Sequence, residues 1–357
     1  MKKSDIARLR LRNQRIVGSE FTKAADVVSW LGAVQAQDYP MAKWALGLRM
    51  TKATDRAVED EIDSGSIIRT HVMRPTWHFV PTEDVRWMLD LTAPRIKAAA
   101  RSRERALELD AKTLSQATKI IARALEGGNH LTRAELMTIL ERSGIARSSQ
   151  RGIHIMFHAE LEQAVCSGKR RGNNSTYALM DERVTPAKKL SKDLALARLA
   201  RVYFQSHGPA TIKDFSWWSG LSLTEARAGL ESIKDRLHAE IIDSETYWMP
   251  YSELQSNNGR GTIHFLPAFD EFTVSYTDRT ASISPEAAKL AITGYAIFNP
   301  TIVAKGQIVG IWKRSFAKGS VVIERQYFPD AGKLSEKTLD TSARRFAAFH
   351  DLKPTLR

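Results

Sequence analysis

Two glutamines separated by one residue are the first feature of this 357-residue sequence that points to chemistry. Gln35 and Gln37 stand in the segment GAVQAQDYP, and Asp38 follows them directly. In a helix, side chains two positions apart point about 200° apart, whereas in an extended segment they point to the same side. Because Pro40 disfavours the helical conformation at the residue before it, we predict that the preceding helix ends near Val34 and that both amides face one ligand.

A glutamine pair of this kind suits the placement of a water molecule. The amide oxygen accepts a hydrogen bond from water, and the NH2 group donates to a sugar or phosphate oxygen. Such a site orients a nucleophilic water without a buried charge, and Asp38 is the nearest group that adds a stronger base. The alternatives are that Gln35 and Gln37 are ordinary cap and turn groups and that Asp38 caps a helix.

A second set of polar side chains stands in the segment IIRTHVMRPTWHFV. Strand alternation places Arg69 and His71 on one face of a first strand, and Thr76 and His78 on one face of a second, opposite the neighbouring aromatic residues. Arg74 stands in the turn between them. Basic groups can bind phosphates while histidines contact sugar or base, so we predict a DNA-binding wing. The alternative is a solvated edge with internally satisfied histidines.

Two further basic segments are candidates for contacts with a DNA backbone. The turn GKRRGNN, with Lys169, Arg170 and Arg171, is the most basic loop in the chain, and Lys313 and Arg314 are adjacent near the C-terminus. The net charge of +13 and the pI near 9.8 favour a nucleic-acid partner. The alternative is a charge that only keeps the protein in solution.

Helix caps and turns indicate which elements position these residues. Thr211 and Ser222 each precede a carboxylate by three residues, which is typical of a capping box at a helix start. Two β-rich runs follow, separated by the turn residues Asp243 and Ser244. The adjacent Trp217 and Trp218 are predicted to pack in the core.

The same order of helices followed by two strands around a polar or basic turn occurs three times, which is the pattern of a winged helix-turn-helix. The predicted fold class is α+β, with tandem winged helix-turn-helix modules followed by a small C-terminal antiparallel β-barrel and a closing helix. A long helix, bent at Pro94, is expected to link the first two modules. The predicted domains are 1–105, 106–187, 188–252 and 253–357.

Composition limits the class of protein. A hydrophobic fraction of 43% and a charged fraction of 26% are those of a globular protein. The single cysteine, Cys166, excludes a disulfide framework and a Cys-rich zinc site. His154 and His158 share a helical face but lack a third ligand, so we predict no metal and no cofactor. No apolar run reaches eighteen residues, and we expect a cytoplasmic, nucleoid-associated protein with no membrane partner.

Five segments, in the same order over residues about 5 to 330, carry a resemblance to a known family: VQAQD, MRPTWHFV, GPATIKDFSWWSGL, LPAFDEFTVSYTDR and IVAKGQIVGIWKR. Together they resemble the AlkZ-like family of winged-helix DNA glycosylases. The resemblance implies tandem winged helices plus a β-barrel, excision of alkylated purines and, in some members, unhooking of interstrand crosslinks. It implies Gln35 and Gln37 as the catalytic motif, and Asp270, which ends a Leu-Pro-x-Phe-Asp block, joins the predicted DNA-contacting residues.

We therefore predict a monofunctional, monomeric DNA glycosylase that acts on double-stranded DNA carrying N7-alkylated or crosslinked purines. Such purines are cationic and leave as neutral bases, so the site needs only a positioned water. The alternative is a non-catalytic winged-helix DNA-binding protein of the transcription-regulator type, which would ordinarily dimerise to match half-sites. A protein-interaction scaffold is a third class, which would not need the basic wings.

Overall fold

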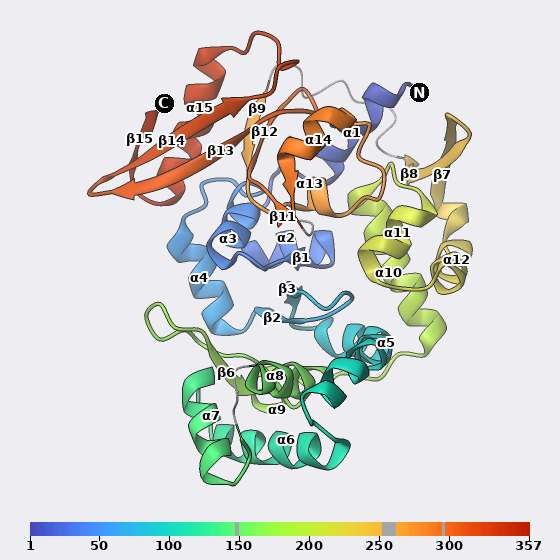
Figure 1. Cartoon of the computed structure of the whole chain (residues 1–357). Helices are drawn as coiled ribbons and strands as arrows, with labels where there is room; N and C mark the ends of the chain where they lie inside the picture. The colour runs from blue at the N-terminus through green and yellow to red at the C-terminus, as the bar shows by residue number, and fades with distance from the viewer. Residues whose placement is uncertain (147–149, 252–261, 295–296) are drawn as a thin grey trace. The chain divides into compact units, whose positions relative to one another are not determined.

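The protein is described from a computed structural model that covers residues 1–146, 150–251, 262–294 and 297–357. Helices and strands are mixed, which confirms the α+β class (Figure 1). Contacts divide the chain into two compact units. Unit 1 comprises Met1–Glu59 and Leu196–Arg357, and unit 2 comprises Asp60–Ala195.

The N-terminal part of unit 1 is mostly helical. Its elements are α1 (Lys3–Asn13), α2 (Ala24–Leu31), β1 (Val34–Gln35), α3 (Tyr39–Gly47) and the start of α4 (Asp55–Ser64). Helix α2 is followed directly by Gly32, which has a φ of 79°, and α3 begins after Asp38 with a proline in its first turn. The predicted interruption between these two helices is therefore confirmed, and the first of them ends three residues before Val34.

A second helical part of unit 1 follows unit 2 along the chain. Its elements are α10 (Lys192–His207, whose first residues belong to unit 2), α11 (Ile212–Ser219), α12 (Leu223–Glu231), the 3-10 turn Lys234–Arg236, β7 (Leu237–Ile242) and β8 (Glu245–Pro250). Both predicted capping boxes, at Thr211 and Ser222, are present. Strands β7 and β8 are antiparallel, and the turn residues Asp243 and Ser244 have φ angles of 50° and 66°.

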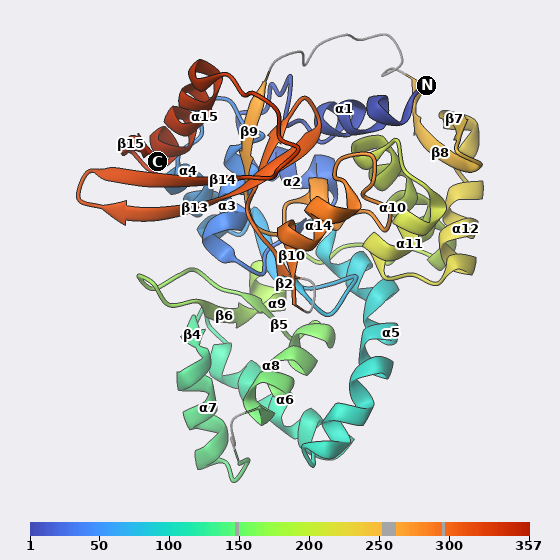
Figure 2. The same cartoon turned by 45° about the horizontal axis from the view of Figure 1, so that its top comes forward.

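The C-terminal β region is a curled five-stranded sheet, a half-barrel (Figure 2). Its strands are β9 (Ile263–Leu266), β12 (Thr301–Ala304), β13 (Gln307–Ala317), β14 (Ser320–Tyr327) and β15 (Lys353–Leu356). The order is β15-β14-β13-β12-β9, and β14 and β15 are parallel whereas the other pairs are antiparallel. The predicted barrel is thus neither closed nor wholly antiparallel, because the chain returns through a helix before adding β15.

That helix is α15 (Glu336–Phe349), which confirms the predicted closing helix. Phe346 of α15 meets Trp312 of β13 edge to face, with ring centroids 4.9 Å apart, and both side chains are buried. The remaining elements of this region are α13 (Glu271–Val274), α14 (Pro285–Ala291), β10 (Ile292–Thr293) and β11 (Ile297–Phe298).

Short β runs separated by turns are expected within residues 257–276, of which 257–261 lie outside the described ranges. Strand β9 is present, but the residues after it form α13. The carboxylate of Asp270 accepts a hydrogen bond from the backbone N–H of Phe272 at 2.9 Å, so it caps a short helix instead of continuing a strand.

Unit 2 is a continuous stretch of chain with its own core. Its elements are β2 (Ile67–His71), β3 (Trp77–Pro81), α5 (Val85–Ala106), α6 (Ala111–Leu125), β4 (Leu131–Thr132), α7 (Arg133–Arg142), α8 (Arg151–Leu161), β5 (Val165–Ser167), β6 (Thr176–Leu179) and α9 (Met180–Arg183). Helix α5 continues through Pro94. Leu114, Leu136 and Ile155 are among the buried residues of the core. Burial raises the pKa of Cys166 to about 12, as expected for a structural thiol.

The contact units do not coincide with the predicted domains, because unit 1 takes residues from both ends of the chain. The boundaries at 105, 187 and 252 therefore stay predictions. Among the described residues, none of the helices combines the length and the apolar composition that a bilayer crossing requires.

Candidate active site

The segment with the two glutamines leaves α2 through a backbone turn that glycine alone accommodates well. Gly32 has a φ of 79° and a ψ of −45°, a conformation that other residues rarely adopt. A Cβ at this position would also lie 2.6 Å from Cγ1 of Val202 on α10. The turn therefore brings α2 against α10 and directs the following residues out of the helix and into β1.

Gln35 and Gln37 differ in their exposure. Gln35 is 7% exposed and lies in β1, whereas Gln37 is exposed and lies just before α3. The backbone N–H of Gln35 donates a hydrogen bond to Oε1 of Glu271 at 2.7 Å. The first amide thus stands at the edge of the protein interior, and the second stands at the surface.

Asp38 has the role of a helix cap. Its Oδ1 accepts a hydrogen bond from the backbone N–H of Met41 at 3.2 Å, so it is the N-cap of α3. Arg314, on β13, is affected by the same carboxylate: burial lowers the pKa of Arg314, and the negative charge of Asp38 partly opposes that shift. Within unit 1, Arg314 is therefore a predicted basic residue that lies close enough to the start of α3 to interact with Asp38.

A buried carboxylate supports this segment, and its role was not predicted from the sequence. Glu271 has no exposed surface, and its Oε2 accepts hydrogen bonds from Ser275 and from Nε1 of Trp218, the latter at 3.1 Å. Nε2 of His207 lies 3.6 Å from the same oxygen. Burial opposes ionisation, but His207, Ser275 and the N–H of Gln35 outweigh it and lower the pKa of Glu271 to about 2.

The neighbouring residue, Asp270, corrects a prediction. Its two carboxylate oxygens each lie 2.8 Å from a guanidinium nitrogen of Arg49, and neither side chain has exposed surface. Arg49 also donates to the backbone oxygen of Gln14 at 2.8 Å. Because its carboxylate is enclosed in this ion pair, Asp270 is a structural residue and does not contact DNA directly.

The strand register of unit 2 corrects the predicted arrangement of the wing. Strands β2 and β3 pair Arg69 with Phe79, Thr70 with His78, and His71 with Trp77. Cross-strand partners share a face, so Arg69 and His71 lie with the aromatic residues, whereas His78 lies on the opposite face. The Arg69 guanidinium stands 4.1 Å from the centroid of Trp77, a side chain that packs against the unit 2 core.

Both histidines of the wing are held inside the protein. His78 is fully buried, and Nδ1 of His71 lies 2.6 Å from the carboxylate of buried Glu160 on α8. Burial of His78 and the contact of His71 with Glu160 therefore favour the alternative, in which the histidines are held within the protein, over contacts with sugar or base. Arg74 and Thr76 are half-buried at the turn and remain candidates for DNA contact.

The basic residues of the loop between β5 and β6 differ in their exposure to solvent. Lys169 and Arg171 are exposed and Arg170 is half-buried. Arg171 forms an ion pair with Glu135, whose pKa is lowered to about 2, first by its hydrogen bonds with Thr132 and then by Arg171. Part of the loop's positive charge is therefore already compensated within unit 2. In unit 1, Lys313 on β13 is exposed.

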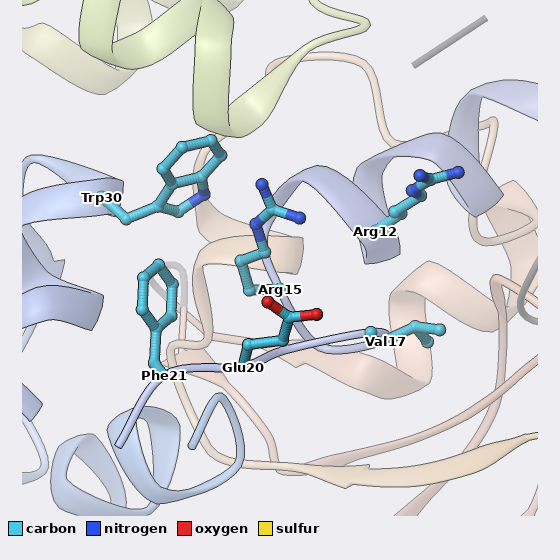
Figure 3. Close-up of a pocket in the computed structure, with 7 residues that line it drawn as sticks. Arg12, Arg15, Val17, Glu20, Phe21 and Trp30 are labelled. Carbon is cyan, nitrogen blue, oxygen red and sulfur yellow. The ribbon is translucent and has the colours of Figure 1, made fainter. Parts of the chain in front are cut away.

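A pocket of about 470 Å³ in unit 1 was not predicted from the sequence (Figure 3). It lies where α1 ends and the chain passes to α2, and its lining residues are Arg12, Arg15, Val17, Gly18, Glu20, Phe21 and Trp30. The signal available in the sequence was the spacing of arginines in RLRLRNQR, which α1 and the turn after it carry.

The prediction that Trp217 and Trp218 both pack in the core is correct for Trp218 only. Trp218 is fully buried and belongs to the support of Glu271, whereas Trp217 is 42% exposed. Its Nε1 donates to the backbone oxygen of Val274 at 2.8 Å, so one edge is fixed while much of the ring meets solvent. In the ranges that the structure describes, no three His, Cys, Asp or Glu side chains converge as metal ligands would.

Comparison with known proteins identifies relatives over nearly the whole chain. Residues 28–349 match the family described as "DNA glycosylase AlkZ-like". The chain is 25% identical over 348 residues to the "Interstrand DNA cross-link repair glycosylase" of Streptomyces sahachiroi, covering 94% of this chain and 92% of that protein. The solved structure of Streptomyces sahachiroi DNA glycosylase AlkZ is similar with a TM-score of 0.84, at 23% identity and with 100% of both chains covered, which shows a shared fold.

Proposed function

Since the chain belongs to the AlkZ-like DNA glycosylase family, we propose that it excises cationic N7-alkylated purines from double-stranded DNA and unhooks interstrand crosslinks, with Gln35 and Gln37 positioning the hydrolytic water. The observation that carries this proposal is the placement of the two amides outside any helix, one at the edge of the interior and one at the surface. Family membership makes the chain a DNA glycosylase, which sets aside the transcription-regulator alternative.

The chemistry of the substrate explains why two neutral amides suffice. An N7-alkylated purine carries a positive charge and departs as a neutral base, so its release needs no general acid. The remaining demand is a water molecule oriented towards a sugar that develops oxocarbenium character. Gln35 and Gln37 each offer an oxygen that accepts from this water and an NH2 group that donates to sugar or phosphate.

The same chemistry limits the range of substrates. A general base contributes about 10² to 10⁴-fold to a rate, and an amide is no strong base. We therefore expect release of cationic lesions and no efficient release of uracil, which leaves as a poorer group. Asp38 is assigned to the start of α3 and not to catalysis, because its carboxylate is already used as the N-cap.

For DNA binding we propose that the three helical regions are winged helices. In unit 2, α6, β4, α7, α8, β5 and β6 follow one another, and the sheet order is β4-β6-β5. In unit 1, α10, α11, α12, β7 and β8 follow in the same way, and Ala210 forms an isolated bridge with Trp248 of β8. In chain order, α2, β1, α3, α4, β2 and β3 repeat the scheme.

The proposed backbone contacts come from exposed or half-buried basic groups in each unit. Those in unit 2 are Arg69, Arg74, Lys169, Arg170 and Arg171, with the hydroxyl of Thr76, and those in unit 1 are Lys313 and Arg314. Such contacts displace counterions, so the logarithm of affinity falls with the logarithm of salt concentration in proportion to their number. A steep salt dependence of binding to undamaged duplex is the expected signature.

The deciding experiment incubates the purified protein with a duplex that bears one N7-methylguanine and measures alkali-labile abasic sites. We expect product with the wild type, little with Gln37→Ala, and wild-type product with Gln116→Ala, which truncates an exposed glutamine on α6. A duplex containing uracil should give no product, and a crosslinked duplex should be unhooked. Equal product from the wild type and Gln37→Ala, at equal DNA binding, would refute the assignment of the glutamine pair.

A further inference from the structure

We propose that Glu271 is a positioning residue of the active site, which holds Gln35 in place through the backbone N–H of that glutamine. The contact is short, at 2.7 Å, and it joins residues 236 positions apart. Glu271 has no exposed surface and therefore does not touch the substrate. This inference rests on the proposed role of Gln35, because it concerns what fixes the orientation of that residue.

The Glu271 carboxylate is itself held by residues of two other helices and by the residue that follows its own helix. Oε2 faces Trp218 on α11, Ser275 just after α13, and His207 at the end of α10. The ring of His207 is stacked on that of Tyr203, with centroids 4.9 Å apart and an angle of 12° between the planes. Because these groups fix Oε2, Oε1 is directed towards β1, where it accepts the hydrogen bond from the backbone N–H of Gln35. This contact fixes the orientation of the peptide group that carries this N–H.

A role in folding alone explains this arrangement poorly. A buried carboxylate costs free energy to desolvate, and a well-packed apolar side chain often stabilises a fold as well or better. A charged acceptor forms a shorter and stronger hydrogen bond than a neutral one. A carboxylate at this position is therefore explained better by the need to hold the Gln35 N–H in one orientation. Displacement of a reacting group by about 1 Å can lower a rate about 100-fold, so precision at Gln35 has a direct catalytic consequence.

The test is Glu271→Gln, which keeps the shape of the side chain but cannot satisfy all of its partners. If the amide oxygen accepts from Gln35, the NH2 group faces the donors of Trp218 and Ser275. We expect the single-turnover rate of base release to fall about 10 to 100-fold while the Kd for the lesion duplex stays within about 2-fold. Hydrogen exchange at the Gln35 amide should accelerate, which reports the loss of positioning without reference to activity.

The matched control is Asp214→Asn, which changes another buried carboxylate of unit 1. Asp214 is 1% exposed and is bonded to Thr211, Thr277 and Arg10. We expect it to lower stability while the folded protein keeps its single-turnover rate and its slow exchange at Gln35. Unchanged exchange at Gln35 in Glu271→Gln, or equal rate losses in the two variants, would overturn the inference. Faster exchange in Glu271→Gln, together with a Gln35→Ala variant of wild-type rate, would instead refute the proposed role of Gln35.

The pocket at the end of α1 leads independently to a second inference. We infer that it binds one nucleotide unit of a DNA strand, with the phosphate against Arg12 and Arg15 and the base against Phe21 and Trp30 (Figure 3). Its volume of about 470 Å³ is in the range of small-molecule sites. Two guanidinium groups against the single carboxylate of Glu20 leave the lining with a net positive charge.

The aromatic wall of this pocket is held in a fixed position. Nε1 of Trp30 donates to the backbone oxygen of Asn13 at 2.6 Å, and Phe21 lies beside the indole with ring centroids 6.2 Å apart. The guanidinium of Arg15 stands 4.4 Å from the centre of the Trp30 ring. A cation beside an aromatic face matches a nucleotide, in which a phosphate lies beside a flat base.

The test is a titration of tryptophan fluorescence with deoxyadenosine monophosphate, deoxyadenosine and inorganic phosphate. We expect the monophosphate to quench the wild type and a Trp217→Phe control, to bind at least about 5-fold more weakly to Arg15→Gln, and to leave Trp30→Phe unquenched. Deoxyadenosine and phosphate alone should bind more weakly than the monophosphate. Equal quenching of Trp30→Phe, or equal affinity for inorganic phosphate and the monophosphate, would overturn the inference.

Discussion

Replacement of Gly32 by alanine should disturb both the stability of unit 1 and the placement of the glutamine segment. At a φ of 79° and a ψ of −45°, backbone strain in an alanine lowers the stability by about 1 to 3 kcal/mol. Its Cβ would also stand 2.6 Å from Cγ1 of Val202, and overpacking of this kind costs about 1 to 3 kcal/mol. The expected loss of unfolding free energy is therefore about 2 to 6 kcal/mol.

A double-variant cycle separates the two contributions. Val202→Ala removes the atom that the new Cβ would meet, so the pair Gly32→Ala and Val202→Ala should recover about 1 to 3 kcal/mol relative to the sum of the single variants. Urea denaturation gives the free energies, and single-turnover base release on the folded protein reports the position of Gln35. The reasoning is refuted if Gly32→Ala changes stability by less than about 0.5 kcal/mol, or if the two variants are additive.

Three other perturbations test the roles of single carboxylates and one lysine. Asp38→Ala should cost about 1 kcal/mol of stability through the lost N-cap, whereas Asp38→Asn, which caps as well, should keep both the stability and the rate of base release. Lys169→Glu should weaken duplex binding and reduce the slope of log affinity against log salt by about one unit. The pKa of Glu271 is lowered in the folded state from its ordinary 4.5 to about 2, so the stability that its charge contributes is present above pH 4.5 and is lost as the pH falls towards 2. Urea denaturation at pH values from 6 to 3 measures this loss, and Glu271→Gln should flatten the curve below pH 4.5.

Each of these predictions has an outcome that contradicts it. A stable Asp38→Asn that releases no base would make Asp38 a catalytic base. Lys188→Glu reverses an exposed charge outside the proposed contacts, so an equal effect of this control would deny Lys169 a specific contact. For the pH dependence, burial also lowers the pKa of His264 to about 4 and lowers that of His207, which faces the Glu271 carboxylate. The comparison with Glu271→Gln therefore separates the Glu271–His207 pair from His264. An unchanged curve in that variant would refute the ionised state of Glu271.

Local signals in the sequence predicted local structure well. The capping boxes at Thr211 and Ser222, the turn at Asp243, and the break between α2 and α3 depend on a few adjacent residues, and the structure has all of them. The strand alternation of β2 was also correct within that strand, with Arg69 and His71 less buried than Thr70. These features follow from short-range hydrogen bonds that a sequence displays directly.

Predictions that depended on distant partners were the ones that failed or were missed. The position of His78 is set by the register between β2 and β3, which alternation within one strand does not give. The DNA contact of Asp270 is predicted from its place in the Leu-Pro-x-Phe-Asp block, and the sequence does not show its partner, Arg49, which stands 221 residues earlier. Glu271 was overlooked for the same reason, since its contacts come from three other parts of the chain.

The division of unit 1 between the two ends of the chain has a consequence for synthesis on the ribosome. Unit 2 is continuous and can fold as soon as its last residues emerge, but Gln35 must wait for Glu271, which is made 236 residues later. At about 5 to 20 residues per second, that interval is roughly 10 to 50 s. During this time the nascent chain already carries the basic segments of unit 2 while its reaction centre is incomplete, so the proposed DNA contacts of unit 2 are made before the site of base release is assembled.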